Sequence, residues 1–132
     1  MMLKIAFFSV LLLFACVGSE EKSNSKSEII LLSEAIQNDP DNIILLLDRA
    51  NYNKDKNNLK SALFDLNQCV ELDSLNPDFH FSVAEIYFKL SKKPNANGKY
   101  PALAKNHLTK AIKLNDKDTR SLSLLGELML AY

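Results

Sequence analysis

The chain of 132 residues carries 16 basic and 16 acidic side chains, so its formal net charge is zero when both histidines are neutral. This balance argues against a nucleic-acid-binding protein, because such proteins present a concentrated basic surface to the phosphates. The cysteines and histidines, Cys16, Cys69, His80 and His107, are too few and too dispersed in the sequence to predict a metal site. The length is enough for one small domain.

Residues 1–15 have the layout of a secretory signal peptide. A single Lys4 precedes an apolar run over residues 5–15. As a helix this run would be about 16 Å long, roughly half the thickness of the hydrocarbon core of a bilayer, so it is too short to span a membrane. A basic start, a short apolar centre and a small final residue favour a signal peptide over the alternative, a buried first helix.

The end of this segment resembles the lipobox of bacterial lipoproteins. Leu13 lies three residues before Cys16 and the small Ala15 lies directly before it, although Phe14 is larger than usual. The resemblance implies cleavage before Cys16, a diacylglycerol on its thiol and a further acyl chain, such as palmitate, on the new amino terminus. Several chains would anchor the protein stably, because each buried CH₂ contributes about 0.8 kcal/mol. Val17 does not resemble the Asp of an inner-membrane retention signal, which favours the outer membrane.

Residues 16–27 form the predicted tether between the lipid on Cys16 and the folded domain. Residues 18–27 are polar, rich in serine and free of apolar side chains, so they cannot bury enough surface to offset the entropy of ordering. Within them, residues 19–21 resemble an acidic tract that some Gram-negative lineages use to send lipoproteins to the cell surface. The expected location is the cell envelope, with either side of the outer membrane open. A lipidated Cys16 leaves Cys69 without a disulfide partner, as a small buried side chain on a helix.

The rest of the chain contains an internal repeat. Residues 33–42, 67–76 and 109–118 share one frame, in which a small residue and a β-branched residue precede a polar turn. The small residues are Ala35, Cys69 and Ala111. The interval from Ala35 to Cys69 is about 34 residues, a period that is typical of tetratricopeptide repeats built from helix pairs. The interval from Cys69 to Ala111 is longer, and it equals one such period with an insertion of about eight residues.

Helical apolar spacing predicts where each repeat begins and ends. A half repeat covers residues 28–42, with a helix that starts at Ser27 and ends before Pro40. A complete repeat covers residues 43–76, with helices over residues 43–54 and 59–72. The next repeat covers residues 77–118 and contains the insertion, with a first helix over residues 78–90. An incomplete repeat covers residues 119–132. The loop over residues 92–99, which contains Pro, Asn and Gly, is predicted to be a tolerated surface insertion, with a functional role as the alternative.

The chain resembles the tetratricopeptide repeat (TPR) family in this frame. The family pattern has a large apolar residue, Leu-Gly and Tyr in the first helix, and Ala, an aromatic or Leu, and Ala in the second. The corresponding residues here are Leu46, Arg49, Ala50, Asn53, Ala62, Leu66 and Cys69; then His80, Val83, Ala84, Tyr87, Ala104, Leu108 and Ala111; and finally Leu122, Leu125, Gly126 and Met129. Arg49, Asn53 and His80 depart from the pattern. The resemblance implies an all-α fold of antiparallel helix pairs, stacked as a short right-handed TPR superhelical solenoid over residues 28–132.

In TPR proteins the first helices of the repeats line a concave surface that binds protein. The corresponding residues here are Ile44, Leu47, Asn51, Asp78, Phe81, Glu85, Phe88 and Arg120. Apolar side chains rimmed by charges suit an extended peptide or a helix laid in a groove. The alternative is that some of these residues pack against neighbouring helices and leave no groove. Only Asn51 resembles the carboxylate clamp of chaperone-binding relatives, so capture of a carboxyl terminus is not expected.

The predicted helix over residues 119–132 has no second helix to pair with. Leu122, Leu125, Leu128 and Met129 would cover the preceding pair on one side and leave apolar surface on the other. We expect either that the repeat array continues past Tyr132, which is favoured, or that this face is buried in a dimer or by a partner.

No catalytic pattern is present in the sequence. It contains no Gly-rich phosphate loop and no nucleophile placed beside a base by a known motif, so neither an enzyme nor a cofactor is predicted. The sequence therefore predicts a membrane-anchored TPR scaffold that mediates protein–protein interaction in the bacterial cell envelope. The alternatives are a structural oligomer that associates through its C-terminal helix, and a regulatory TPR module of a longer envelope protein.

Overall fold

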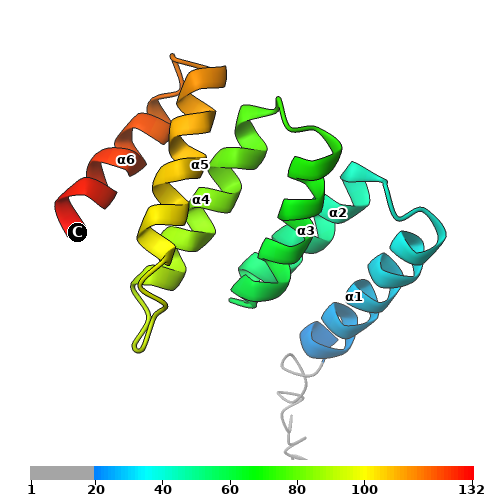
Figure 1. Cartoon of the computed structure of the whole chain (residues 1–132). Helices are drawn as coiled ribbons and strands as arrows, with labels where there is room; N and C mark the ends of the chain where they lie inside the picture. Colours follow the sequence, from blue (N-terminus) through cyan, green and yellow to red (C-terminus); the bar gives the residue numbers. More distant parts are fainter. Residues whose placement is uncertain (1–19) are drawn as a thin grey trace, which may run out of the picture.

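The computed structural model describes the backbone of residues 20–132 and the side chains of residues 27–132. The described residues form six α-helices and no strand: α1 (Glu20–Asn38), α2 (Ile43–Asp55), α3 (Leu59–Leu72), α4 (Pro77–Ser91), α5 (Tyr100–Leu114) and α6 (Thr119–Ala131). Figure 1 shows the helices following one another in chain order, from α1 at one end of the array to α6 at the other. The prediction of an all-α helical-repeat solenoid is confirmed. The predicted signal peptide and Cys16 lie outside the described residues.

The first helix begins earlier than the sequence pattern suggested. α1 starts at Glu20, inside the segment predicted to be a flexible tether up to residue 27. Residues 20–27 contain neither Gly nor Pro, the two residues that most disfavour a helix interior. The helix therefore extends into this polar segment without an apolar face of its own, and the predicted tether is corrected over residues 20–27.

Helices α2, α4 and α6 hold equivalent positions in the repeat and begin in the same way. The side-chain oxygen of Asn42 accepts hydrogen bonds from the backbone N–H groups of Ile44 and Leu45. Asn76 and Asp118 accept one from the N–H two residues later. Such caps satisfy the N–H groups that the first turn of a helix leaves without partners. The intervals between the caps equal those between the small residues of the repeat frame, so the turn that starts each repeat recurs with the repeat itself.

Two complete pairs, α2 with α3 and α4 with α5, are held together at small side chains. Ala50 and Ala62 lie together in one buried cluster, and Ala84 and Ala104 lie together in the next. Larger apolar residues surround these contacts. The buried residues at equivalent positions of the two pairs are Leu46 and His80, Leu66 and Leu108, and Cys69 and Ala111. The positions predicted from the repeat frame thus form the core.

Arg49, the first departure from the family pattern, is explained by a partner on α3. Its Nε and Nη2 atoms donate to the two carboxylate oxygens of Asp65 over 2.9 and 2.7 Å, and Asp65 is only 1% exposed. The hydrogen bonds to Asp65 raise the pKa of Arg49, and burial opposes that effect. A bidentate pair of this kind fixes the relative position of the two helices as well as satisfying the buried charge.

Cys69 lies in the interior of this pair, as predicted. Burial, with the Asp65 charge as a second cause, raises the pKa of its thiol to about 11. Since the thiolate is the reactive form, Cys69 is an inert packing residue at neutral pH.

The last described helix covers only one side of the array. Leu128 is buried against Ala84 and Leu108 of the preceding pair. Leu122 and Met129, which correspond to residues that pack on the second helix in complete pairs, are exposed. The expected open apolar surface on α6 is therefore present in the described part of the chain.

The close helix contact predicts a sharp sensitivity to side-chain size. Ala62→Leu should lower the free energy of unfolding by about 1–3 kcal/mol, because the larger side chain forces α2 and α3 apart. The matched control is Ala102→Leu on the exposed side of α5. Urea unfolding of both variants measures the difference, and equal stability of the two would contradict the assigned repeat frame.

Candidate functional site

The concave surface predicted from the sequence begins with α2. Ile44 is 71% exposed and Asn51 is exposed, so both are accessible to a partner. Leu47 is half-buried and packs against the core clusters on both sides of α2. The first helix thus offers one large exposed apolar side chain and one amide, with Leu47 partly engaged in the core.

Three of the predicted residues come together where α4 faces α6. Arg120 pairs with Asp78 and with Asp118, its Nε lying 2.8 Å from Asp118 Oδ1. Its guanidinium also lies 4.8 Å from the centre of the Phe81 ring. The hydrogen bonds from Arg120 hold the pKa of Asp118 below its usual range. This cluster ties α6 to α4 through internal contacts, so its charges are already satisfied within the chain.

The remaining two predicted residues have structural partners. Glu85 bonds to Lys89 over 3.0 Å and lies 3.7 Å from Lys54 of α2. Phe88 is 5% exposed, packs in the cluster that α6 closes, and carries Lys92 over its ring. The prediction that Phe88 is an accessible binding residue is wrong: on α4 its position faces α6, which covers it.

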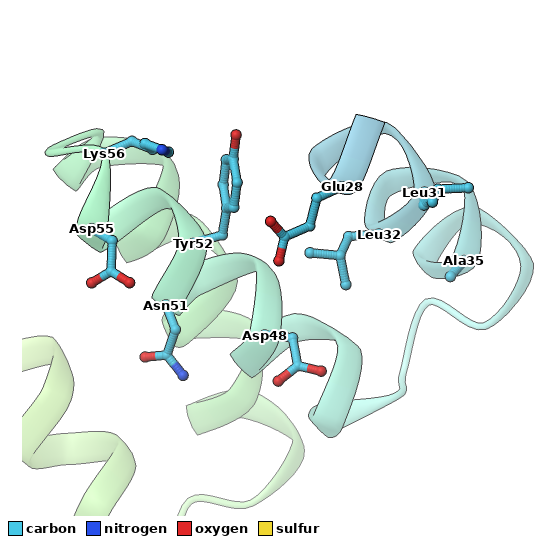
Figure 2. A pocket seen from close by; sticks show the side chains of 9 residues that line it. All are labelled: Glu28, Leu31, Leu32, Ala35, Asp48, Asn51, Tyr52, Asp55 and Lys56. Carbon is cyan, nitrogen blue, oxygen red and sulfur yellow. The ribbon is translucent and has the colours of Figure 1, made fainter. Parts of the chain in front are cut away.

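A groove that the sequence did not predict lies between α1 and α2. It has a volume of about 660 Å³. The lining residues come from both helices and are Glu28, Leu31, Leu32, Ala35, Asp48, Asn51, Tyr52, Asp55 and Lys56. Figure 2 shows Glu28 and Leu32 pointing from α1 towards Tyr52 of α2. Asn51 is the one predicted binding residue that lines this groove.

The groove combines an apolar floor with an acidic rim. Leu32 and Ala35 of α1 and the ring of Tyr52 of α2 supply apolar surface. Glu28, Asp48 and Asp55 supply three carboxylates, all on exposed residues, against the single cation of Lys56. The Lys56 ammonium lies 5.7 Å from the centre of the Tyr52 ring. An apolar concavity with a few polar groups around it is the usual form of a ligand site.

The repeat frame contained the signal for this groove. Glu28, Leu32 and Ala35 lie one repeat period before Ala62, Leu66 and Cys69, which pack on α2. The same three positions of α1 should therefore face a helix, and in the described part of the chain no helix covers them. Counting the frame back to residue 28 would have located the groove.

A pair of histidines connects α4 and α5 on the other side of the array. The Nε2 of the buried His80 lies 3.0 Å from the Ser74 carbonyl oxygen, to which it donates. Neutral His80 therefore has an unprotonated Nδ1, which accepts a hydrogen bond from His107 Nδ1 over 3.1 Å. Burial is the main cause that lowers the pKa of His107 to about 4, and repulsion by a positive charge on His80 or on Lys110 acts in the same direction. The two Nδ1 atoms lie close enough that only one proton can be accommodated between them.

No group of three metal-ligating side chains occurs among the described residues. None of the helices in residues 20–132 is long and apolar enough to span a membrane.

The comparisons with known proteins find similar folds but no similar family or curated sequence. No protein-family model matches the sequence, and no curated protein matches it. Solved structures do match. One crystal structure of MamA superposes with a TM-score of 0.70 at 18% identity, covering 89% of this chain and 66% of that chain. A second MamA structure gives 0.71 at 20% identity, covering 84% and 56%. The chain thus spans less than two thirds of the length of these MamA chains.

Two further structures have lengths closer to that of this chain. One is the first TPR of Spaghetti (RPAP3) bound to the HSP90 peptide SRMEEVD, with a TM-score of 0.68, 18% identity and coverage of 84% and 82%. The other is the Yersinia enterocolitica type III secretion chaperone SycD in complex with a peptide of the translocator YopD, with 0.67, 16% and 84% of both chains. This chain has a TPR-like fold. At these identities the likeness shows the TPR-like architecture alone.

The histidine pair predicts a loss of stability in mild acid. The pKa of His107 is about 4 in the folded chain, and that of an unfolded histidine is about 6.5. The unfolded chain therefore binds more protons between these values, so the stability present above pH 6.5 falls as the pH decreases towards 4. Urea midpoints at pH 7 and pH 5 should differ less in His107→Gln than in the unchanged protein. The same pH dependence in both would show that His107 is not responsible.

Proposed function

We propose that this protein is a membrane-anchored TPR scaffold of the bacterial cell envelope that binds a segment of a partner protein. The observation that carries the binding role is the groove between α1 and α2, with its apolar floor and about 660 Å³ of open volume. The TPR-like fold supports the same role, because two structures of that fold are complexes with peptides. The binding face consists of this groove, which Asn51 lines, and the exposed Ile44, which lies one helical turn before Asp48 on α2.

The anchor is proposed from the sequence around Cys16. Leu13 and Ala15 stand where a lipobox has its aliphatic and small residues, and an apolar run of signal-peptide length precedes them. Two or more acyl chains on Cys16 would hold the protein at a membrane with an essentially permanent attachment. Val17 favours the outer membrane over the inner one.

Substitution of Cys16 tests the anchor directly. We expect the protein from its host to lose residues 1–15, to gain the mass of the acyl chains and to sediment with membranes. Cys16→Ser should remain unmodified and leave the membrane fraction, because it lacks the thiol that carries the lipid. Intact-mass spectrometry and fractionation measure both properties. If the two forms behave alike, the lipoprotein proposal is wrong, whereas the binding groove is unaffected by that result.

Site-specific photocrosslinking tests the binding face. A photoreactive residue in place of Asn51 should give one or a few discrete adducts in living cells, because the groove and its rim would contact the partner. The matched control is the same residue in place of Asn106, an exposed asparagine on α5. Denaturing gels and mass spectrometry of the adducts provide the measurement. Equal adduct patterns from the two positions, or none from position 51, would contradict a binding role for this face.

A further inference from the structure

The α1 side of the groove matches, position by position, a surface that the complete pairs keep covered. Leu32 corresponds to Leu66 and Leu108, and Ala35 corresponds to Cys69 and Ala111. All four equivalent residues are buried, and Leu66, Cys69 and Leu108 cluster with residues of the first helix of their own pair. α1 is therefore a second helix whose own first helix is not among the described residues, and Leu32 and Ala35 form the surface on which such a helix would lie.

The α2 side of the groove also corresponds to a surface that is covered in the complete pairs. Tyr52 corresponds to Ile86 of α4 and Leu128 of α6. Ile86 and Leu128 are both buried, and each packs against the pair that precedes its helix. Both walls of the groove thus present the residues that a first helix contacts in the complete repeats. The shape required of an occupant is that of one helix, with small or aliphatic side chains towards α1 and α2.

The difference from the complete pairs lies in charge. Glu28 stands where Ala62 and Ala104 make close helix contacts with no exposed surface. A helix laid on α1 would remove the Glu28 carboxylate from water, which is costly unless a cation pairs with it. Asp48 and Asp55 add two further carboxylates along the α2 rim. The groove therefore favours a helix that carries lysine or arginine beside its apolar stripe.

The open face of α6 in a second copy does not meet that requirement. This face carries the exposed Leu122 and Met129, and α6 contains no lysine. The one cation of α6, Arg120, is already paired with Asp78 and Asp118. Charge complementarity thus favours a basic partner over self-association through α6.

We propose that the groove between α1 and α2 binds a basic amphipathic helix from a partner protein. The bound helix occupies the position that a first helix paired with α1 would have. This inference rests on the proposed binding function and specifies the class of partner. The lysines or arginines of the helix pair with Glu28, Asp48 and Asp55, and its aliphatic side chains cover Leu32 and Ala35.

Disulfide trapping with a synthetic peptide tests this binding site without a known partner. Ala35→Cys places a thiol on the groove floor, and the substitution is mild because cysteine is the natural residue at the equivalent position 69. Cys69 itself stays unreactive, since burial raises its pKa to about 11. The probe is a synthetic helical peptide of about four turns with a Leu and Ala stripe, lysines on the flanks and one central cysteine. The full-length protein, purified from membranes in a nonionic detergent, is mixed with the probe in a glutathione buffer, and adducts are mapped by mass spectrometry.

Three controls isolate position and charge. The matched thiol is Ala102→Cys, on the exposed side of α5. The matched peptide has glutamate in place of every lysine and keeps the same apolar stripe. The third control compares two triple variants. The groove set combines Glu28→Gln, Asp48→Asn and Asp55→Asn. The distant set combines the exposed positions Glu71→Gln, Asp73→Asn and Asp116→Asn. The groove set should reduce trapping of the basic peptide at position 35 by about tenfold, as expected for three surface ion pairs, and the distant set should leave it unchanged.

The possible outcomes distinguish a failure of the basic-helix proposal from a failure of the proposed binding function. Preferential trapping of the basic peptide at position 35, lost in the groove set, supports the proposal. Equal trapping of the acidic peptide, or no effect of the groove set, overturns it. Adducts from position 51 in cells together with no peptide trapping at position 35 would leave the binding function standing and remove the basic helix. Disulfide-linked oligomers of an Ala35→Cys and Met129→Cys protein, in place of peptide adducts, would identify a second copy as the occupant.

Discussion

The close approach of two helices at small side chains is the constraint on which this fold depends. Ala50 against Ala62, and Ala84 against Ala104, allow the helices of each pair to come together without exposed surface between them. Because a stacked array has no closed core, every helix buries one face against its own pair and another against its neighbour. Any described helix that lacks one of these neighbours therefore presents a surface already shaped for a helix.

That constraint explains why the two ends of the described array differ from its middle. On α6 the residues without a neighbour, Leu122 and Met129, are both apolar and exposed. On α1 the corresponding surface keeps Leu32 and Ala35 but replaces a packing alanine with Glu28. A carboxylate at a close-contact position is poorly suited to a permanent apolar interface and well suited to one that selects a charged occupant.

The repeat frame predicted the fold because its small residues and its caps recur at a fixed spacing, and both act locally. Spacing alone could not decide which exposed-looking residues a neighbouring helix would cover. Phe88 was misassigned because its burial depends on how α6 lies against α4, which no local pattern encodes. The start of α1 was missed for a different reason, since residues 20–27 are polar throughout and have no apolar periodicity that would indicate a helix. The groove itself was encoded in the frame, at Glu28, Leu32 and Ala35.

Two of the three departures from the family pattern, Arg49 and His80, are explained by contacts that form when the helix pairs assemble. Asp65 and His107 hold equivalent positions on the second helices, and each bonds to a different place on its first helix: Arg49 in one pair, His80 in the other. Arg49 and His80 lie at different positions of the repeat, about one helical turn apart in the frame. Two pairs that share the same small residues are thus distinguished by their buried polar contacts. An exchange of α3 and α5 would leave Arg49 facing a histidine in place of the Asp65 carboxylate, so the Arg49–Asp65 contact favours the pairing of neighbours in the chain.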